Sequence, residues 1–423
     1  MIQPRNVLPS RTEANIRKVS DECQAIDSCD SIVKAILLLL VLKYRKEAAM
    51  QVRNYLVDGP ADSSSATKSR GLERVLAECS EIVLCFRPMK RTFALRTSML
   101  TLFAVGSSLM AQEKALPPTL VVVNQGDHDI SLIDPAAGRQ VATIGVEGIT
   151  GHEAIVSPDG RTAYVPIYGD SGVGRAGTDG DKMVAIDLAS RKITGTVKFD
   201  HGVRPHCVRY NPHDGLLYLT TELDQSITLV DPHSLKIVGT IPTGQPQSHM
   251  LVLSPDGRFG YTANVGPGTV SVLDLSARKT SAIIPISTNT QRISISNDGS
   301  MVFTADQTTP RLAVIDTAKN AIKTWITLPG IGYGTTPTPD GRWLLVALRT
   351  SHQVALVDLK TLNVTRTLEV PAIPTEILVR PDGRRAYVSC GGKAEVAVID
   401  LNDWKLDRLI EAGKGADGLA WGQ

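Results

Sequence analysis

Three of the eight histidines belong to a regularly spaced series of polar residues. His152, His206 and His249 open the series, which continues from His249 at intervals of 42 residues as Gln291, Tyr333, Thr375 and Asp417. Neutral imidazoles bind Zn, Cu, Mn or Fe, and they exchange protons near neutral pH. If the fold brings the three histidines together, they predict a single transition-metal site, a pair of acid–base groups or a ligand site. The plainer alternative is a solvated channel mouth, where histidines bond only to water and backbone.

The elements that position this series are short strands of an internal repeat. A turn phrase ending in Asp-Gly recurs six times, and its last five glycines are 42 residues apart: Gly215, Gly257, Gly299, Gly341 and Gly383. A second phrase, three mostly apolar residues followed by Asp, recurs seven times, at Asp134, Asp187, Asp231, Asp274, Asp316, Asp358 and Asp400. Repeats of about 42 residues with four short strands each are typical of propeller blades. Seven copies predict an all-β, seven-bladed β-propeller of four-stranded antiparallel blades.

Within one copy, strands are expected at residues 251–253, 260–263, 269–273 and 280–284, which are rich in Val, Ile, Thr and Tyr. The turn phrase suits a tight hairpin, because Asp bonds to nearby amides and Gly accepts a positive φ. The Asp that ends each third strand is expected to fix a turn rather than to bind metal.

The ends of the repeat region predict how the ring closes. The first copy begins with a second-strand phrase at residues 120–124 and lacks an innermost strand. Residues 418–421 match the innermost-strand pattern and can fill that place, which would remove an open edge. The propeller is therefore expected over residues 118–423.

The repeat also predicts where a site would lie. The loop that leads into each innermost strand lies at one mouth of a propeller's channel. The candidate ligand-binding residues are His152, Arg204, His206, His249, Gln291, Arg292, Tyr333, Thr375 and Asp417. The residues that follow the histidines are expected to turn away from the channel unless the strand start is irregular, because side chains alternate along a strand. They are Glu153, Cys207 and Met250.

Loops between the middle strands supply a second set of equivalent positions: Asn124, Glu222, Asn264, Asp306, Arg349 and Cys390. In the second copy this loop is expanded to residues 168–182, which contain five glycines. An insertion of that kind can be a lid, a ligand clamp or an idle surface loop. No Gly-Lys-Ser/Thr follows, so it lacks the phosphate-loop pattern.

One repeat contains the phrases SPDG (254–257), GYTAN (260–264) and TVSVLD (269–274). These phrases resemble the YVTN-type propeller family, and the resemblance covers residues 118–422. It implies the propeller fold and no particular activity, since that family mixes binding proteins with members of unknown role. Residues 203–206 and 221–223 are similar to phrases of the 6-phosphogluconolactonase-like lactonases. That similarity implies His206 and Glu222 as catalytic candidates and Arg204 as a contact for an acidic substrate.

The residues before the repeat predict export. A basic start after Met89, an apolar stretch at 99–110 and Ala111 form a secretory signal at 89–111, so the mature protein is expected in the periplasm or outside the cell. Residues 1–88 are then a misassigned start, or else a genuine disordered or helical extension. Their apolar run, residues 35–42, is too short to cross a bilayer, and no membrane anchor is expected in the mature chain.

The composition limits the classes of partner and cofactor that we expect. The chain has 45 basic and 43 acidic residues, which gives no indication of nucleic-acid binding. It contains no Cys-x-x-Cys-His, which excludes covalent c-type haem. We expect a monomer that recognises a small molecule, a polymer or a protein at the channel mouth, and a metal-dependent or lactonase-like enzyme using His152, His206, His249 and Glu222 is the alternative.

Overall fold

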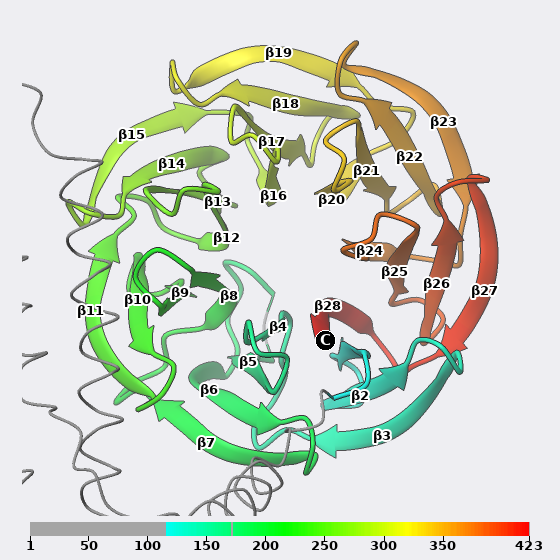
Figure 1. Ribbon diagram of the computed structural model, residues 1–423. Helices are drawn as coiled ribbons and strands as arrows, with labels where there is room; N and C mark the ends of the chain where they lie inside the picture. Colours follow the sequence, from blue (N-terminus) through cyan, green and yellow to red (C-terminus); the bar gives the residue numbers. More distant parts are fainter. Residues whose placement is uncertain (1–115, 171, 423) are drawn as a thin grey trace, which may run out of the picture. The chain divides into compact units, whose positions relative to one another are not determined.

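The computed structural model describes residues 116–170 and 172–422, which form seven four-stranded antiparallel sheets arranged as blades around one axis (Figure 1). The predicted fold class and number of blades are confirmed. Throughout the described residues the regular elements are strands, and no helix there is long and apolar enough to cross a membrane. The predicted signal at 89–111 and the extension at 1–88 lie outside the described residues, so both stay predictions.

Each blade runs from an innermost strand near the axis to an outermost strand at the rim. Blade one combines β28 (Ala416–Gly422) with β1 (Thr119–Asn124), β2 (Asp129–Asp134) and β3 (Arg139–Gly145). Blade two is β4 (Ile155–Val156), β5 (Thr162–Gly169), β6 (Asp179–Asp187) and β7 (Lys192–Lys198). Blade three is β8 (Pro205–Asn211), β9 (Leu216–Thr221), β10 (Ser226–Asp231) and β11 (Lys236–Pro242). Blade four is β12 (Ser248–Leu253), β13 (Phe259–Asn264), β14 (Thr269–Asp274) and β15 (Lys279–Pro285).

The remaining three blades follow the same order. Blade five is β16 (Thr290–Ile295), β17 (Met301–Asp306), β18 (Arg311–Asp316) and β19 (Ala321–Thr327). Blade six is β20 (Gly332–Pro337), β21 (Trp343–Leu348), β22 (Gln353–Asp358) and β23 (Asn363–Glu369). Blade seven is β24 (Pro374–Val379), β25 (Arg385–Cys390), β26 (Glu395–Asp400) and β27 (Lys405–Glu411).

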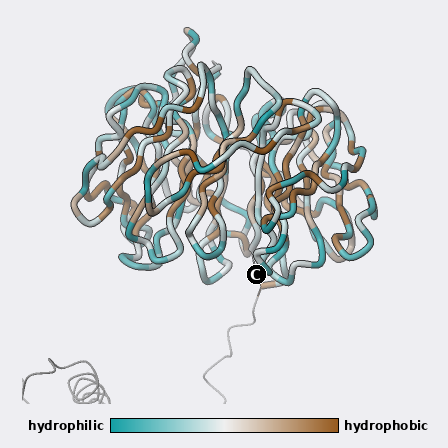
Figure 2. Tube along the Cα trace, turned by 90° about the horizontal axis from the view of Figure 1, so that it is seen from above, coloured by the Kyte–Doolittle hydropathy of each residue, from teal (hydrophilic) through white to brown (hydrophobic). Residues whose placement is uncertain are grey.

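The core lies between neighbouring blades. The middle strands are buried on both faces, whereas an outer strand such as β15 alternates between exposed and covered residues. Figure 2 shows the same arrangement after a turn of 90°, with apolar segments inside the blades and hydrophilic loops at the two faces. Each fully buried Val, Leu or Ile contributes about 1.5–3 kcal/mol relative to an exposed one. The packing between blades therefore holds the ring rigid around its axis.

The recurrent aspartates fix turns, as the sequence predicts. Asp134 Oδ1 accepts hydrogen bonds from the backbone N–H groups of Ala136 and Ala137, both at 2.9 Å. The other six third strands end in an Asp that caps the following turn in the same way. These carboxylates are thereby committed to local structure.

The C-terminal strand closes the ring. β28 pairs antiparallel with β1, with Val121 opposite Ala420 and Thr119 opposite Gly422. The predicted closure is confirmed, and Figure 1 shows β28 at the inner edge of the blade that contains β2 and β3.

The innermost strands begin irregularly. Their pairing with the next strand shifts register near the start, between Ser248 and Met250 in blade four and between Gln291 and Ile293 in blade five. Arg292 has a φ of 28° at this point. Such a bulge interrupts the alternation of side chains, so consecutive residues can both face the axis.

Candidate functional site

The three histidines of the predicted site lie together. The rings of His206 and His249 are 3.5 Å apart between centroids, and the ring of His152 lies 5.0 Å from that of His206. Tyr168, at the end of β5, packs edge-on against both His206 and His249. The sequence analysis missed Tyr168 as a site residue, although its place at the start of the insertion was a usable signal.

Glu222 connects this ring cluster to the rest of the site. One of its oxygens, Oε2, accepts hydrogen bonds from Tyr168 Oη at 2.8 Å and from His249 Nδ1 at 3.0 Å. Burial raises the pKa of Glu222, but its bonds to His249 and Tyr168 outweigh burial and leave the pKa lowered. Glu222 is therefore an anion at neutral pH, although only 2% of it is exposed.

The two central imidazoles are neutral at neutral pH. Burial, followed by the proximity of His249 and His152, holds the pKa of His206 well below its usual range. Burial also lowers the pKa of His249, and Glu222 compensates only in part. The Nδ1 atom of His206 is buried without a hydrogen-bond partner. Among residues 116–170 and 172–422, no group of three or more His, Cys, Asp or Glu side chains is placed to hold a metal ion, so the predicted metal site gains no geometric support.

Arg204 links the cluster to the glycine-rich insertion. It precedes β8 with a φ of 50°, and its Nε donates to Asp179 Oδ1 at 2.5 Å while Nη2 donates to the carbonyl of Arg175 at 2.7 Å. The neighbouring Gly202 permits this approach, because a Cβ there would lie 2.5 Å from Cβ of Asp179. The insertion is thus fastened over Arg204 rather than projecting freely.

A cavity of about 380 Å³ lies under the insertion. Its walls come from the insertion, the loop after β9 and the loop before β12: Gly174, Arg175, Ala176, Arg204, Glu222, Leu223, Gln225, Pro246 and Gln247. Two of these residues, Arg204 and Glu222, were predicted from the sequence. Glu222 Oε1 is buried and has no hydrogen-bond partner, although Arg204 Nη1 lies 3.8 Å away. Glu222, which lines this cavity, therefore keeps one carboxylate oxygen without a hydrogen bond, with only an ion pair to Arg204.

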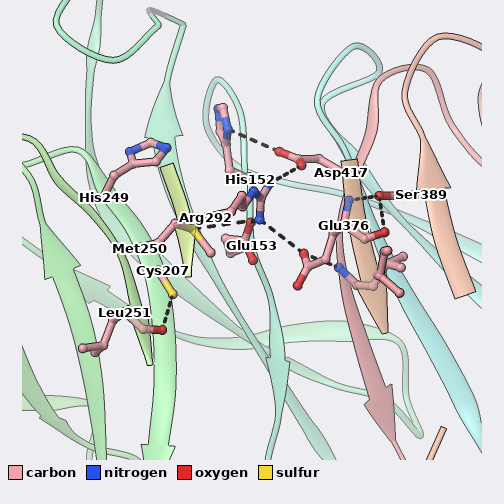
Figure 3. Close-up of polar contacts among 12 residues, drawn as sticks. His152, Glu153, Cys207, His249, Met250, Leu251, Arg292, Glu376, Ser389 and Asp417 are labelled. Atoms are coloured by element: carbon pink, nitrogen blue, oxygen red, sulfur yellow. Dashed lines mark hydrogen bonds and ion pairs between the residues drawn. The ribbon is translucent and has the colours of Figure 1, made fainter. Parts of the chain in front are cut away.

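Deeper along the axis, Arg292 gathers carboxylates from three blades (Figure 3). Its Nη1 bonds to Glu153, its Nη2 donates to Asp417 Oδ1 at 2.6 Å, and Glu376 Oε2 lies 3.6 Å from Nη1. Met250 Sδ lies 3.9 Å from the same Nη1. Glu153 and Met250 therefore contact Arg292 near the axis, which is the exception expected for an irregular strand start.

Cys207 follows the prediction, since its Sγ lies 3.5 Å from the carbonyl oxygen of Leu251 between blades. The sequence nevertheless carried a signal for the ion cluster. Glu153, Arg292 and Glu376 each stand one residue after a member of the spaced polar series, and all three are charged.

The charges in this cluster are unequal. Burial raises the pKa of Asp417, but Arg292 and His152 outweigh burial and lower it. Burial and the carboxylate of Glu153 raise the pKa of Glu376 well above its usual range, against the opposing effect of Arg292 and Arg209. Asp417 is therefore charged at neutral pH, whereas the environment of Glu376 favours its protonated form.

The other predicted positions have more local roles. Tyr333 lies between two guanidinium groups, those of Arg292 at 5.1 Å and Arg349 at 4.7 Å from its ring centroid. Thr375 Oγ1 donates to the carbonyl of Ile373. Gln291 uses its backbone carbonyl to accept a bond from Thr304. Asn124, Asn264 and Asp306 bond to side chains of their own blades.

The raised pKa of Glu376 gives a testable pH dependence. A carboxyl whose folded pKa lies above the unfolded value of 4.5 favours the fold below pH 4.5, and that contribution is lost as pH rises towards the folded pKa. Glu376→Gln mimics the protonated form. We therefore expect the variant to gain stability relative to the parent between pH 5 and pH 8, measured as urea-unfolding free energies. Glu369→Gln, at an exposed position of β23, is the control, and an equal response of both variants would contradict the assignment.

Comparison with known proteins supports the fold and adds one suggestion about a cofactor. The family described as the cytochrome D1 heme domain matches residues 210–333. Hydrazine synthase from Kuenenia stuttgartiensis is 19% identical with a TM-score of 0.58, and the match covers 67% of this chain and 92% of that chain. A functionally unknown protein from Desulfotomaculum acetoxidans DSM 771 is 14% identical with a TM-score of 0.61, covering 72% of this chain and 99% of that one. At such identities the likeness concerns the fold alone.

The matched segment and the cavity under the insertion do not fit a haem. Three histidines fall in the matched segment, and two of them, His213 and His233, are exposed in the turns after β8 and β10. The third, His249, is 2% exposed and packs against His206. Pockets for drug-sized ligands measure about 300–1,000 Å³, so a cavity of about 380 Å³ is small for a tetrapyrrole and its side chains. The match with the haem domain extends from within β8 to the start of β20.

Proposed function

We propose that this propeller is a ligand-binding protein whose site is the cavity under the glycine-rich insertion, defined by the nine lining residues given above. The observation that carries the proposal is Glu222 Oε1, a buried carboxylate oxygen in the cavity wall without a hydrogen-bond partner. An unsatisfied buried acceptor costs about 1–3 kcal/mol or more. A ligand that donates an O–H or N–H to it would recover that free energy.

The rest of the wall indicates the class of ligand. Gln225 and Gln247 supply amide donors and acceptors, and Arg204 supplies a cation already held by Asp179. A volume of about 380 Å³ suits a small molecule. These groups favour a polyhydroxylated ligand, such as a sugar, a sugar acid or a sugar lactone. A polymer would have to present one such unit to the cavity.

The insertion supports a role as a clamp. Gly174 has a φ of 68°, and a Cβ at this position would lie 2.7 Å from the side-chain amide of Gln247. The insertion from blade two thereby reaches the loop that precedes β12 in blade four. It can cover a ligand without any movement of the blades themselves.

A lactone hydrolase is the second candidate, and the bond between Glu222 and His249 favours it. A carboxylate on Nδ1 fixes the tautomer of a neutral imidazole and strengthens it as a base. The low exposure of His249 argues for binding first, because water and substrate would have to reach Nε2 through the cavity.

The proposal is tested by titrating glucose, gluconate and glucono-δ-lactone into the protein and following heat release and acid production. We expect binding of at least one of them, weakened at least tenfold by Leu223→Trp, which fills the cavity from an exposed position, and by Glu222→Gln. A similar substitution far from the cavity, Leu409→Trp on β27, is the control. Binding that Leu223→Trp leaves unchanged would overturn the proposal. Acid production lost in His249→Gln would support the hydrolase instead.

A further inference from the structure

A second cavity lies among the innermost strands, apart from the one under the insertion. It measures about 170 Å³ and is enclosed by residues of β8, β12, β16, β20 and β24. It shares no lining residue with the larger cavity. Its occupant would therefore be bound independently of the ligand discussed above.

Two guanidinium groups reach this cavity. Arg292 is 3% exposed, and although Glu153 and Asp417 take its Nη atoms, its Nε is buried without a hydrogen-bond partner. Arg209, on β8, donates through Nη1 to the carbonyl of Val208. An orphaned N–H on a buried cation attracts an acceptor, and a negatively charged acceptor makes the strongest bond.

The charges around the cavity leave room for an anion. Arg209 and Arg292 carry two positive charges, while Glu153 and Asp417 carry two negative ones that already face Arg292. The third carboxyl, Glu376, lines the cavity, and burial and Glu153 raise its pKa, which favours its neutral form. The thiol of Cys207 near Arg209 is neutral, since burial raises its pKa to about 11. An anion beside the two arginines would favour the neutral form of Glu376 further.

Part of the cavity lining is apolar. This part is formed by Met250, Val252, Ile293, Ile295 and Pro337. In the same lining, Ser294 Oγ and Thr335 Oγ1 form a hydrogen bond of 2.7 Å. Phosphate or sulfate would lose hydration against such a wall without recovering it. An anion with a short hydrocarbon body would instead bury that body there.

We propose that this cavity binds a short aliphatic monocarboxylate, with its carboxylate on Arg292 Nε and Arg209 and its hydrocarbon part against Val252 and Ile293. The volume limits the ligand to a few carbon atoms. The site is distinct in residues and in chemistry from the one under the insertion.

The test is calorimetric titration of the full chain with butyrate, butanamide and inorganic phosphate. We expect butyrate to bind at least tenfold more tightly than butanamide, which has the same shape without the charge, and more tightly than phosphate. Val252→Phe fills the cavity while keeping both arginines and should abolish butyrate binding. Arg209→Gln should weaken it at least tenfold, whereas Arg258→Gln, at an exposed turn of blade four, should leave it unchanged.

Three results would overturn the proposal: equal affinity for butyrate and butanamide, butyrate binding that survives Val252→Phe, or an equal loss in Arg258→Gln. Circular dichroism and melting of each variant show whether the fold is intact. Leu223→Trp keeps this site and closes the other, so it should bind butyrate normally. The two proposals can therefore fail separately.

Discussion

Deleting Asp417–Gln423 is expected to destabilise the whole ring. The deletion removes most of β28, including Leu419 and Ala420, which are 3% and 4% exposed, and it opens the edge of β1. It also removes the carboxylate that holds Arg292 Nη2. Together, these losses should lower the free energy of unfolding by more than roughly 5 kcal/mol. For a chain of this size, about 2 °C of melting midpoint is lost per kcal/mol, so the midpoint should fall by about 10 °C or more.

Differential scanning calorimetry of the purified truncated and full-length chains measures the effect. Leu409→Ser, on the outermost strand β27 with 43% of the side chain exposed, is the control and should melt within about 1 °C of the parent. A truncated protein that melts as the parent does would show that β28 is dispensable for closure.

Arg292→Met is expected to be the most damaging single substitution at the axis. It leaves the buried carboxylates of Glu153 and Asp417 without their cation, and removing one partner of a buried ion pair costs about 3–5 kcal/mol. The loss should be measured by urea unfolding at pH 7. Adding Asp417→Asn removes one of the stranded charges, so the double variant should be more stable than Arg292→Met alone.

The pH dependence gives this prediction a second readout. In the parent, Arg292 and His152 hold the pKa of Asp417 down despite burial. Ionised Asp417 therefore stabilises the fold above its unfolded pKa of 3.8, and this stabilisation is lost as the pH falls below that value. Without Arg292, burial dominates and the pKa of Asp417 rises. The cost of Arg292→Met should therefore be smaller at pH 4.5 than at pH 7. A cost that does not change with pH, and that Asp417→Asn does not relieve, would show that Arg292 acts through packing alone.

The fold could be predicted from the sequence because its determinants are local and repeated. Each turn needs its Asp and Gly at fixed offsets, and the sequence places them six times, with the last five glycines 42 residues apart. The closing strand could be predicted as well, because the first copy lacks an innermost strand.

The site was harder to predict because it depends on departures from the repeat. Glu153 and Met250 both contact Arg292 near the axis, although strict alternation along their strands predicts the opposite. Tyr168 reaches Glu222 through contacts between blades two and three that no sequence period encodes. The convergence of His152, His206 and His249 was visible because it follows the repeat itself.

The pairing of β28 with β1 also constrains the order of folding. Thr119 and Gly422 are partners across some 300 residues of chain, so β1 emerges from the ribosome long before its neighbour exists. Contacts of such large sequence separation form late and slowly. Blades two to seven are each continuous in sequence and can assemble as they are synthesised. Blade one is incomplete until β28 has been synthesised, and until then the edge of β1 is exposed. Association with chaperones, or aggregation between nascent chains, should therefore concentrate on β1.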